Sequence, residues 1–184
     1  MNVRYFDNAA TTRVKDEVLE EMLPYLKEKF GNPSSMYTIG REAKKAIENA
    51  RERVAKLINC KANEIYFTGS GSESDNTAIK GIAHKRAFKG KHIITSKIEH
   101  PAVLHTCQSL EREGFKVTYL NVNKDGIVDI NQLINSIRND TILISIMYAN
   151  NEIGTMQPIT KIGEIAHKNG IIFHTDAVQA CANT

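Results

Sequence analysis

The sequence has little of what marks a secreted, metal-binding or membrane protein. It contains only three cysteines in 184 residues, at Cys60, Cys107 and Cys181, an odd number placed far apart. No Cys-x-x-Cys pair or Cys/His spacing predicts a zinc site, and a disulfide framework is not expected. No apolar run approaches the ~20 residues of a membrane-spanning helix, and the first residues carry no signal- or transit-peptide pattern. These absences predict a cytoplasmic protein without a membrane partner.

An excess of one charge is also missing. The formal net charge is only +3, and basic residues such as Lys44, Lys45 and Arg51 lie along the expected solvent-facing side of a helix. We therefore expect no nucleic-acid partner. Hydrophobic residues make up 41% of the chain and charged residues 24%, which is the balance of a globular protein with a buried core.

What the sequence does contain is an alternation of strand and helix patterns from about residue 64 onward. The expected strands are Glu64–Thr68, His92–Ser96, Lys116–Leu120, Thr141–Met147 and Gly170–Asp176. The expected helices lie between them, at residues 73–88, 101–113, 129–138 and 159–168. This alternation predicts an α/β fold with a mostly parallel sheet and helices on its faces.

The first 60 residues differ, because they show helical patterns only. Helices are expected at Lys15–Lys29 and Ile39–Ile58, separated by the breaker "GNPSS". In the second of them, apolar residues recur at three- and four-residue steps and form one stripe. We interpret residues 1–60 as an N-terminal helical segment and residues 61–184 as an α/β domain. The alternative is a single domain over residues 1–184.

Ligands of open α/β sheets gather beyond the carboxyl ends of the strands, so the residues just after each strand are candidates for a site. After the first expected strand, "TGSGSESDN" offers two glycines and a capping box formed by Ser70 and Glu73. Its free N–H groups at a helix start suit a phosphate. The alternative is a well-capped turn that binds nothing. The stretch is neither a Walker A loop nor a GxGxxG motif.

Polar residues also come after the second and fourth expected strands. His100 stands immediately before Pro101, which is expected to begin a helix. A histidine at this edge can stack on a flat ring or transfer protons, and the alternative is a hydrogen-bonded surface histidine. In "YANNEIGTMQP", Asn150 and Asn151 either bind a ligand or satisfy the backbone of the loop.

The fifth expected strand ends in an acid. Asp176 comes after the apolar run "GIIF", and a carboxylate there is costly unless it meets a cation or a donor. Pyridoxal phosphate would place its phosphate on the Ser/Gly turn, its ring against His100 and its protonated nitrogen at Asp176. Asn151 and Gln179 would then lie near a ring oxygen. A metal site formed by His100, His174 and Asp176 is disfavoured, because neighbouring side chains on one strand diverge.

Six motifs, in this order and spacing, resemble those of cysteine desulfurases. They are "YFDNAATT", "FGNPSS", "GSESDN", "SKIEHPAVLHTC", "YANNEIGTMQPI" and "HTDAVQ". These enzymes, of the NifS/IscS type, have the class V aminotransferase fold, and the likeness covers essentially the whole chain. The resemblance implies an incomplete pyridoxal-phosphate-dependent transferase fold, namely the N-terminal portion of such an enzyme.

The resemblance also implies roles for individual residues. Gly71 and Ser72 match the turn that holds the cofactor phosphate, and His100 matches a histidine that stacks on the ring and takes part in acid–base steps. Asp176 matches the aspartate at the ring nitrogen. The remaining matches are Asn151 and Gln179 near the ring oxygen, and Asn8, Ala9, Ala10 and Asn32 at the border of the substrate pocket.

The chain departs from the family pattern after the aspartate. In the family, the lysine that holds the cofactor covalently comes later, in a Ser-Gly-His-Lys motif, whereas the last lysine here is Lys168. The nucleophilic cysteine and the arginine for the substrate carboxylate are absent as well. We therefore expect pyridoxal phosphate to bind non-covalently at best, and no desulfurase turnover by this chain alone.

The resemblance implies partners too: L-cysteine as substrate, and a sulfur acceptor or iron–sulfur scaffold protein. A homodimer is expected, because members of the family are homodimers with sites near the interface. A complementing chain is the other expected partner, because Glu64–Thr68 would otherwise lack its neighbouring strands and leave the chain marginally stable. A selenocysteine lyase is an alternative within the family. A non-catalytic module that keeps the pyridoxal phosphate pocket is an alternative of another class.

Overall fold

The structure, a computed structural model, describes residues 4–181 and divides the chain into two compact units between Phe67 and Thr68. The first unit consists of helices and loops, and the second contains the sheet. The domain division at residue 60 stays a prediction of the sequence.

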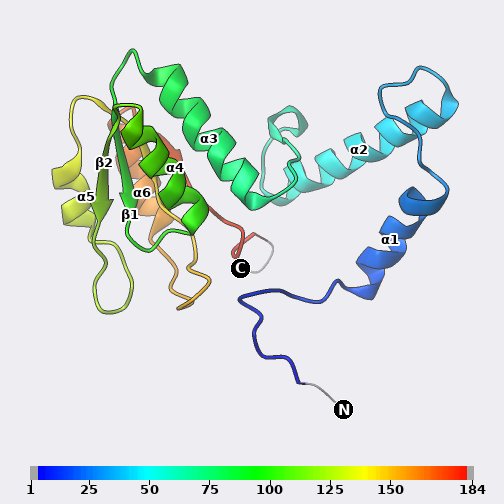
Figure 1. The fold of residues 1–184 in the computed structure, drawn as a ribbon, viewed down its shortest axis with the longest axis horizontal. Coiled ribbons are helices and arrows are strands. Elements are labelled where there is room, and N and C mark those ends of the chain that lie inside the picture. Colours follow the sequence, from blue (N-terminus) through cyan, green and yellow to red (C-terminus); the bar gives the residue numbers. More distant parts are fainter. Residues whose placement is uncertain (1–3, 182–184) are drawn as a thin grey trace. The chain divides into compact units, whose positions relative to one another are not determined.

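The first unit contains two α-helices and a short 3-10 helix. The apolar stripe expected on the second helix is present, but only Gly40 and Ala55 of that helix are buried, and the first helix buries no residue. The second helix ends at Leu57, and the chain turns away at Asn59, whose φ of 55° lies in the left-handed region; the Cys60 N–H then bonds to the Ala55 carbonyl. The elements are α1 (Asp16–Lys27), α2 (Thr38–Leu57) and η1 (Ala62–Glu64) (Figure 1).

The breaker "GNPSS" packs closely against the start of α2. A Cβ on Gly31 would lie 2.3 Å from the Ile39 carbonyl oxygen, and one on Gly40 would lie 2.5 Å from the Ser35 carbonyl oxygen. The Asn32 carbonyl accepts a hydrogen bond from the Ser35 N–H at 3.0 Å, which closes the turn. Glycine is therefore required at both points of contact, since neither backbone can yield.

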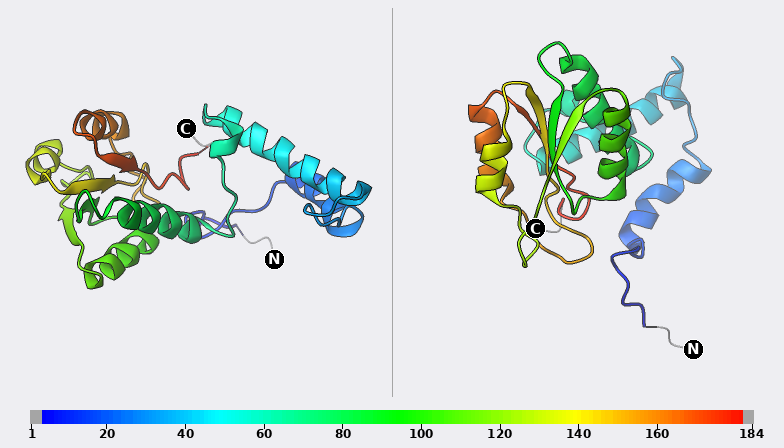
Figure 2. Two further views of the ribbon diagram at one scale, coloured as in Figure 1. Left: turned by 90° about the horizontal axis from the view of Figure 1, so that it is seen from above. Right: turned by 60° about the vertical axis from the view of Figure 1, so that its left-hand side comes forward.

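The second unit is a four-stranded parallel sheet covered by helices, as the alternating pattern predicts. The strand order is β2-β1-β3-β4. Figures 1 and 2 show α3 and α4 on one face of this sheet and α5 and α6 on the other. The strands are β1 (His92–Ser96), β2 (Lys116–Leu120), β3 (Thr141–Ser145) and β4 (Ile172–His174). The helices are α3 (Gly71–Arg86), α4 (Pro101–Arg112), α5 (Ile130–Ser136) and α6 (Ile159–Lys168).

Each face of the sheet carries its own hydrophobic core. Ile93 of β1 packs with α3 and α4, whereas its neighbour Ile94 packs with α5 and α6, because successive strand side chains point to opposite faces. Both side chains are fully buried, and all five residues of β1 and of β3 belong to the buried class. A rigid, two-sided core therefore supports the loops at the carboxyl edge of the sheet.

The expected strand at Glu64–Thr68 is wrong. Ile65 has an extended backbone (φ −93°, ψ 131°), but this segment forms no strand in the described structure, and the Tyr66 side chain is 82% exposed. The segment is instead tied to α2, where the Arg51 guanidinium donates to the Ile65 carbonyl and lies 5.0 Å from the centre of the Phe67 ring. A β-rich pattern produces a strand only where another strand offers its backbone groups.

The last two strands are shorter than the expected runs, although their backbones stay paired beyond the strand ends. The Ile146 N–H donates to the His174 carbonyl at 3.1 Å, and the Tyr148 N–H donates to the Asp176 carbonyl at 2.8 Å. These bonds hold Asp176 beside the segment that comes after β3. The acid therefore lies at the carboxyl edge of the sheet, where the sequence predicts it.

The cysteines lie in three different environments. Cys107 is on the buried side of α4, in the core, and burial raises the pKa of its thiol to about 12. Its thiolate is therefore disfavoured, and Cys107 is no nucleophile. Cys181 is exposed and Cys60 is half-buried, and all three are free thiols. Within residues 4–181, no helix has the length and apolar character to cross a bilayer.

Candidate functional site

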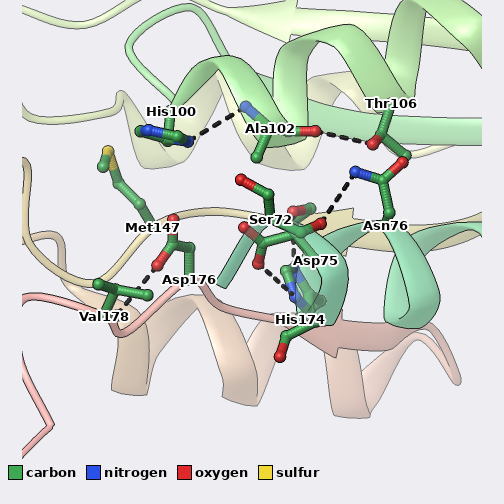
Figure 3. Close-up of polar contacts among 12 residues, drawn as sticks. Ser72, Asp75, Asn76, His100, Ala102, Thr106, Met147, His174, Asp176 and Val178 are labelled. Carbon is green, nitrogen blue, oxygen red and sulfur yellow. Dashed lines mark hydrogen bonds and ion pairs between the residues drawn. The ribbon is translucent and has the colours of Figure 1, made fainter. Parts of the chain in front are cut away.

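The loops at the carboxyl edge of the sheet bring together side chains from α3, from the loop before α4, and from the segments after β3 and β4. In Figure 3, Ser72, His100, Met147 and Asp176 surround one common space. The three polar residues of this group are three of the residues that the sequence predicts as a site. Parallel strands deliver their loops to one edge, which explains the convergence.

The start of α3 offers an anion site. Ser70 caps the helix by accepting a hydrogen bond from the Glu73 N–H at 3.2 Å. The expected capping box is only half formed, because the Glu73 carboxylate accepts from the Gly69 N–H at 2.7 Å rather than from Ser70. In residues 4–181, the N–H groups of Gly71 and Ser72 have no hydrogen-bond partner, so both remain available to a ligand.

Gly71 lies where the start of α3 approaches the chain after β4. A Cβ at this position would lie 3.0 Å from Cγ2 of Val178, close enough that the valine would have to move. Val178 also donates its N–H to the Asp176 carboxylate at 3.0 Å. Glycine at position 71 therefore allows the phosphate-type turn and the acid to approach each other.

His100 is the N-cap residue of α4, with Pro101 in the first turn as expected. Its Nδ1 accepts a hydrogen bond from the Ala102 N–H at 3.1 Å. An accepting Nδ1 carries no proton, so the neutral ring has its proton on Nε2. The ring is exposed, and Figure 3 shows it across the space from Asp176, with Met147 at the border of that space. His100 can therefore cap α4 through Nδ1 and still offer its exposed ring for stacking.

Asp176 is buried, with 9% of its surface exposed. It forms no ion pair with any residue of the described range 4–181, and its carboxylate accepts one backbone N–H, that of Val178. A buried carboxylate with one donor has capacity left for a cation or a further donor. Gln179, three residues later, is exposed at the same edge of the sheet.

The two asparagines after β3 have different roles. Asn150 is buried and organises the loop: its side chain donates to the Ile98 carbonyl at 2.9 Å and accepts from the Glu152 and Ile153 N–H groups. Asn151 is more open, and its side chain donates to Glu152 at 3.1 Å. The structural role that the sequence left open thus belongs to Asn150, and Asn151 stays a candidate for ligand contact.

Glu99 is a site residue that the sequence did not predict. It lies directly before His100, is only 5% exposed, and accepts hydrogen bonds from Ser96 and from the Met147 N–H. Burial and the nearby charges of Asp176 and Asp75 raise the pKa of its carboxyl to about 7. The sequence "KIEHPAV" shows an acid directly before His100, but it gives no signal that Glu99 is buried.

A second group that the sequence did not predict lies beneath the start of α3. Asp75 is 5% exposed, and its Oδ1 lies 3.5 Å from His174 Nε2, while His174 Nδ1 lies 2.9 Å from the Ser145 hydroxyl. Figure 3 shows this contact below the space that Ser72 borders. The three residues connect α3 to the ends of β4 and β3, so they fix the helix start against the sheet.

The residues expected at the border of a substrate pocket belong to the first unit. Asn8, Ala9 and Ala10 form an exposed turn in which the Ala10 N–H bonds to the Asp7 carbonyl at 3.1 Å. Asn32 lies in the loop that packs on α2. Their place in a substrate pocket stays a prediction.

The arrangement suits a flat ligand with an anionic group and a cationic ring atom. The helix start supplies N–H donors for the anion, His100 supplies a ring, and Asp176 supplies a buried negative charge. Lys168 cannot reach such a ligand, because it ends α6 at the opposite edge of the sheet, before β4 begins. The described residues hold no group of three or more His, Cys, Asp or Glu side chains that could bind a metal.

Comparison with known proteins identifies relatives of high identity. "Cysteine desulfurase IscS" of Methanosarcina thermophila is 64% identical over 176 residues, which cover 96% of this chain and 44% of the relative. The protein of the same name from Clostridium botulinum is 59% identical, with the same coverage. The chain therefore spans less than half the length of these relatives.

Solved structures give the same result. A "NifS-like protein" superimposes with a TM-score of 0.93 at 46% identity, over 96% of this chain and 49% of that one. "SspA in complex with cysteine" superimposes with a TM-score of 0.93 at 47% identity, over 97% and 51% of the two chains. The model of the aminotransferase class-V family matches residues 4–184. The chain thus belongs to the class V aminotransferase family, and within it resembles the cysteine desulfurases.

Proposed function

We propose that this chain supplies the phosphate-, ring- and nitrogen-binding part of a pyridoxal-phosphate site in a cysteine desulfurase. The observation that carries the proposal is the convergence of Ser72, His100 and Asp176 on one space at the carboxyl edge of the sheet. The high identity to proteins named cysteine desulfurase supports the choice of reaction.

Each group in the space has a task that its chemistry suits. The N–H groups of Gly71 and Ser72 hold the phosphate, and Asp176 holds a proton on the ring nitrogen. His100 covers one face of the ring and can move a proton at Nε2, while Asn151 and Gln179 orient the ring oxygen. Bound in this way, the cofactor supplies an electron-accepting ring for bond cleavage next to the substrate amine.

The substrate of the whole enzyme is L-cysteine, and the sulfur passes to an acceptor or iron–sulfur scaffold protein. Asn8, Ala9, Ala10 and Asn32 border the substrate. No lysine comes after Lys168 in the 184 residues, so this chain holds the cofactor without a covalent bond. Turnover requires a positioned amine base and a sulfur nucleophile that these residues do not supply. A complementing chain provides these groups, since a homodimer of the same 184 residues holds two copies of the same incomplete site. The protein acts in the cytoplasm.

The decisive experiment is a titration of the purified chain with pyridoxal phosphate, monitored by absorbance and protein fluorescence. Saturable binding is expected, and Asp176→Asn should weaken it strongly. Asp140→Asn is the matched control, because Asp140 pairs with Arg138 at the opposite edge of the sheet and should leave affinity unchanged. Borohydride should yield no reduced lysine adduct, and sulfide release from L-cysteine should stay at the level of free cofactor. Equal affinity of the Asp176 variant, or no saturable binding, would contradict the proposal.

A further inference from the structure

Just after the end of β3, the backbone N–H of Met147 needs a hydrogen-bond acceptor inside the protein. β3 is paired with β4 on one side and with β1 on the other. Beyond the strand end, Ile146 and Tyr148 donate their N–H groups towards the β4 side. The N–H of Met147, between them, points towards the β1 side because alternate residues face opposite neighbours. β1 ends at Ser96, so no strand is left there to accept it.

The side chain of Glu99 accepts the hydrogen bond from the Met147 N–H in place of a strand. Both of its carboxylate oxygens accept from the Met147 N–H, at 3.1 and 3.0 Å, and Oε1 also accepts from the Ser96 hydroxyl at 2.5 Å. The carboxyl group therefore takes the position of a missing strand residue. Leaving a buried N–H unpaired destabilises the folded state, so this hydrogen bond stabilises the loop.

A second hydrogen bond fastens the same two loops. The side chain of Asn150 donates to the Ile98 carbonyl at 2.9 Å. Ile98 and Glu99 thus attach the loop after β1 to the segment after β3, through two neighbouring residues. His100 is the next residue along the chain, where it is also the N-cap of α4.

We propose that Glu99 is a positioning residue: by tying the loop after β1 to Met147, it fixes the His100 imidazole in the orientation that faces Asp176. The proposal rests on the proposed function in one respect, that the ring so oriented is the one that covers the cofactor. Glu99 itself touches neither substrate nor cofactor. Its effect is transmitted through the backbone of residues 98–100.

Two other acids lie near Glu99 and affect its protonation. The acids that face it are Asp75 from α3 and Asp176 from the segment after β4, and His100 is the next residue in the loop. Its raised pKa means that, near neutral pH, the carboxyl group is present in both protonation states. In both states it keeps an acceptor oxygen for Met147, so the tie does not depend on full ionisation.

The test is the tautomer of His100, observed by ¹⁵N NMR of the imidazole nitrogens in the 184-residue chain without cofactor. In the wild type, the bond from the Ala102 N–H should give separate signals for an unprotonated Nδ1 and a protonated Nε2. Glu99→Ala should merge these signals towards the averaged values of a mobile ring. Glu99→Gln, which keeps an acceptor oxygen for Met147, should restore the wild-type signals.

The matched control is Glu113→Ala, which removes a glutamate that contacts a different histidine, His84, at 2.7 Å. It should change the His84 signals and leave those of His100 untouched. If the alanine variant of Glu99 does not fold, Glu99→Asp retracts the carboxyl by one methylene and should merge the His100 signals in the same way.

Unchanged His100 signals in a folded Glu99→Ala or Glu99→Asp chain would overturn the proposal, as would a Glu99→Gln chain that behaves like the alanine variant. The readout needs no cofactor, so it is separate from the proposed function. Failure of pyridoxal phosphate to bind the wild type would contradict the function alone. Normal binding with an undisturbed His100 would contradict the positioning role alone.

Discussion

The two units of this chain use the same kinds of amphipathic helix with opposite results. In the second unit, the apolar sides of four helices cover a sheet and are buried with it in two cores. In the first unit, α1 buries no residue, and large side chains such as Leu26 remain exposed, in this case to 70%. Both units show clear helical patterns in the sequence, so the pattern alone does not decide burial.

The difference teaches where the stability of the chain resides. Helices in water gain most of their stability from packing an apolar face rather than from propensity. α3 and α4 have that face packed on β1 and β3, whereas α1 does not have it packed within its own unit. The second unit can therefore support a site at its sheet edge, whereas α1 gains little stability from packing of this kind.

Hydrogen exchange of the purified chain should reveal this contrast with the largest effect. Amides of β1 and β3 open only by global unfolding of their unit, while those of α1 open locally, so their exchange rates should differ at least about a thousandfold. Residues 64–68, which form no strand, should exchange as fast as α1. Similar protection in α1 and β1 of a dilute monomer would remove the contrast.

A matched pair of leucine substitutions sharpens the same comparison. Leu143 of β3 is fully buried, so Leu143→Ala should lower the free energy of unfolding by about 2–5 kcal/mol. Leu26→Ala in α1 removes an exposed side chain and should change that energy by no more than about 0.5 kcal/mol. Urea unfolding monitored by circular dichroism measures both. A loss of more than about 2 kcal/mol for Leu26→Ala would show a packed first unit instead.

The strands and helices of the second unit could be predicted from the sequence because local pattern and tertiary context agree there. β1 and β2 have the bounds that the sequence predicts, since each β-rich run has a neighbour to pair with. Glu64–Thr68 has the same kind of pattern and no neighbour, so its prediction was wrong. Pairing is a property of the assembled sheet, which no local window contains.

The candidate site shows the same limit. His100 and Asp176 could be placed at the sheet edge because each comes shortly after a β-rich run. The roles of Glu99 and Asn150 could not, since both depend on how far the segment after β3 continues alongside the segment after β4 once β1 has ended. Strand register sets this relation, and a local stretch of sequence does not contain it. In the folded chain, Glu99 and Asn150 join the loop after β1 to the segment after β3.

The second unit should also be the source of pH-dependent stability, through Glu99. Its pKa is raised from 4.5 to about 7 in the folded state, so between these values the folded chain binds a proton that the unfolded chain has lost. The free energy of unfolding should therefore fall as pH rises through this window, by up to about 3 kcal/mol, with the full contribution present below pH 4.5.

Urea unfolding at several pH values checks the slope. Glu99→Gln should flatten it, because the amide does not titrate. Glu164→Gln, at an exposed position of α6 in the same unit, should keep the wild-type slope. The facing acids Asp75 and Asp176 remain in both variants, so a difference between the two variants belongs to Glu99. Equal slopes in both variants would place the pH dependence elsewhere.

The smallest expected effect compares the two helix starts. Ser70 caps α3 through the Glu73 N–H, so Ser70→Ala should cost about 1 kcal/mol of unfolding free energy. Tyr37 holds the same position in α2 without a side-chain cap, so Tyr37→Ala should cost less than about 0.5 kcal/mol.

The two cap substitutions differ in the size of their effect on stability and also in the backbone N–H groups that they leave unpaired. Loss of the Ser70 hydroxyl leaves one more free N–H beside Gly71 and Ser72, while the Glu73 carboxylate still holds Gly69. A phosphate at this helix start would meet that N–H, so added inorganic phosphate should recover part of the lost stability in Ser70→Ala and none in Tyr37→Ala. Equal response of both variants to phosphate would mean that the start of α3 is a capped turn and not an anion site.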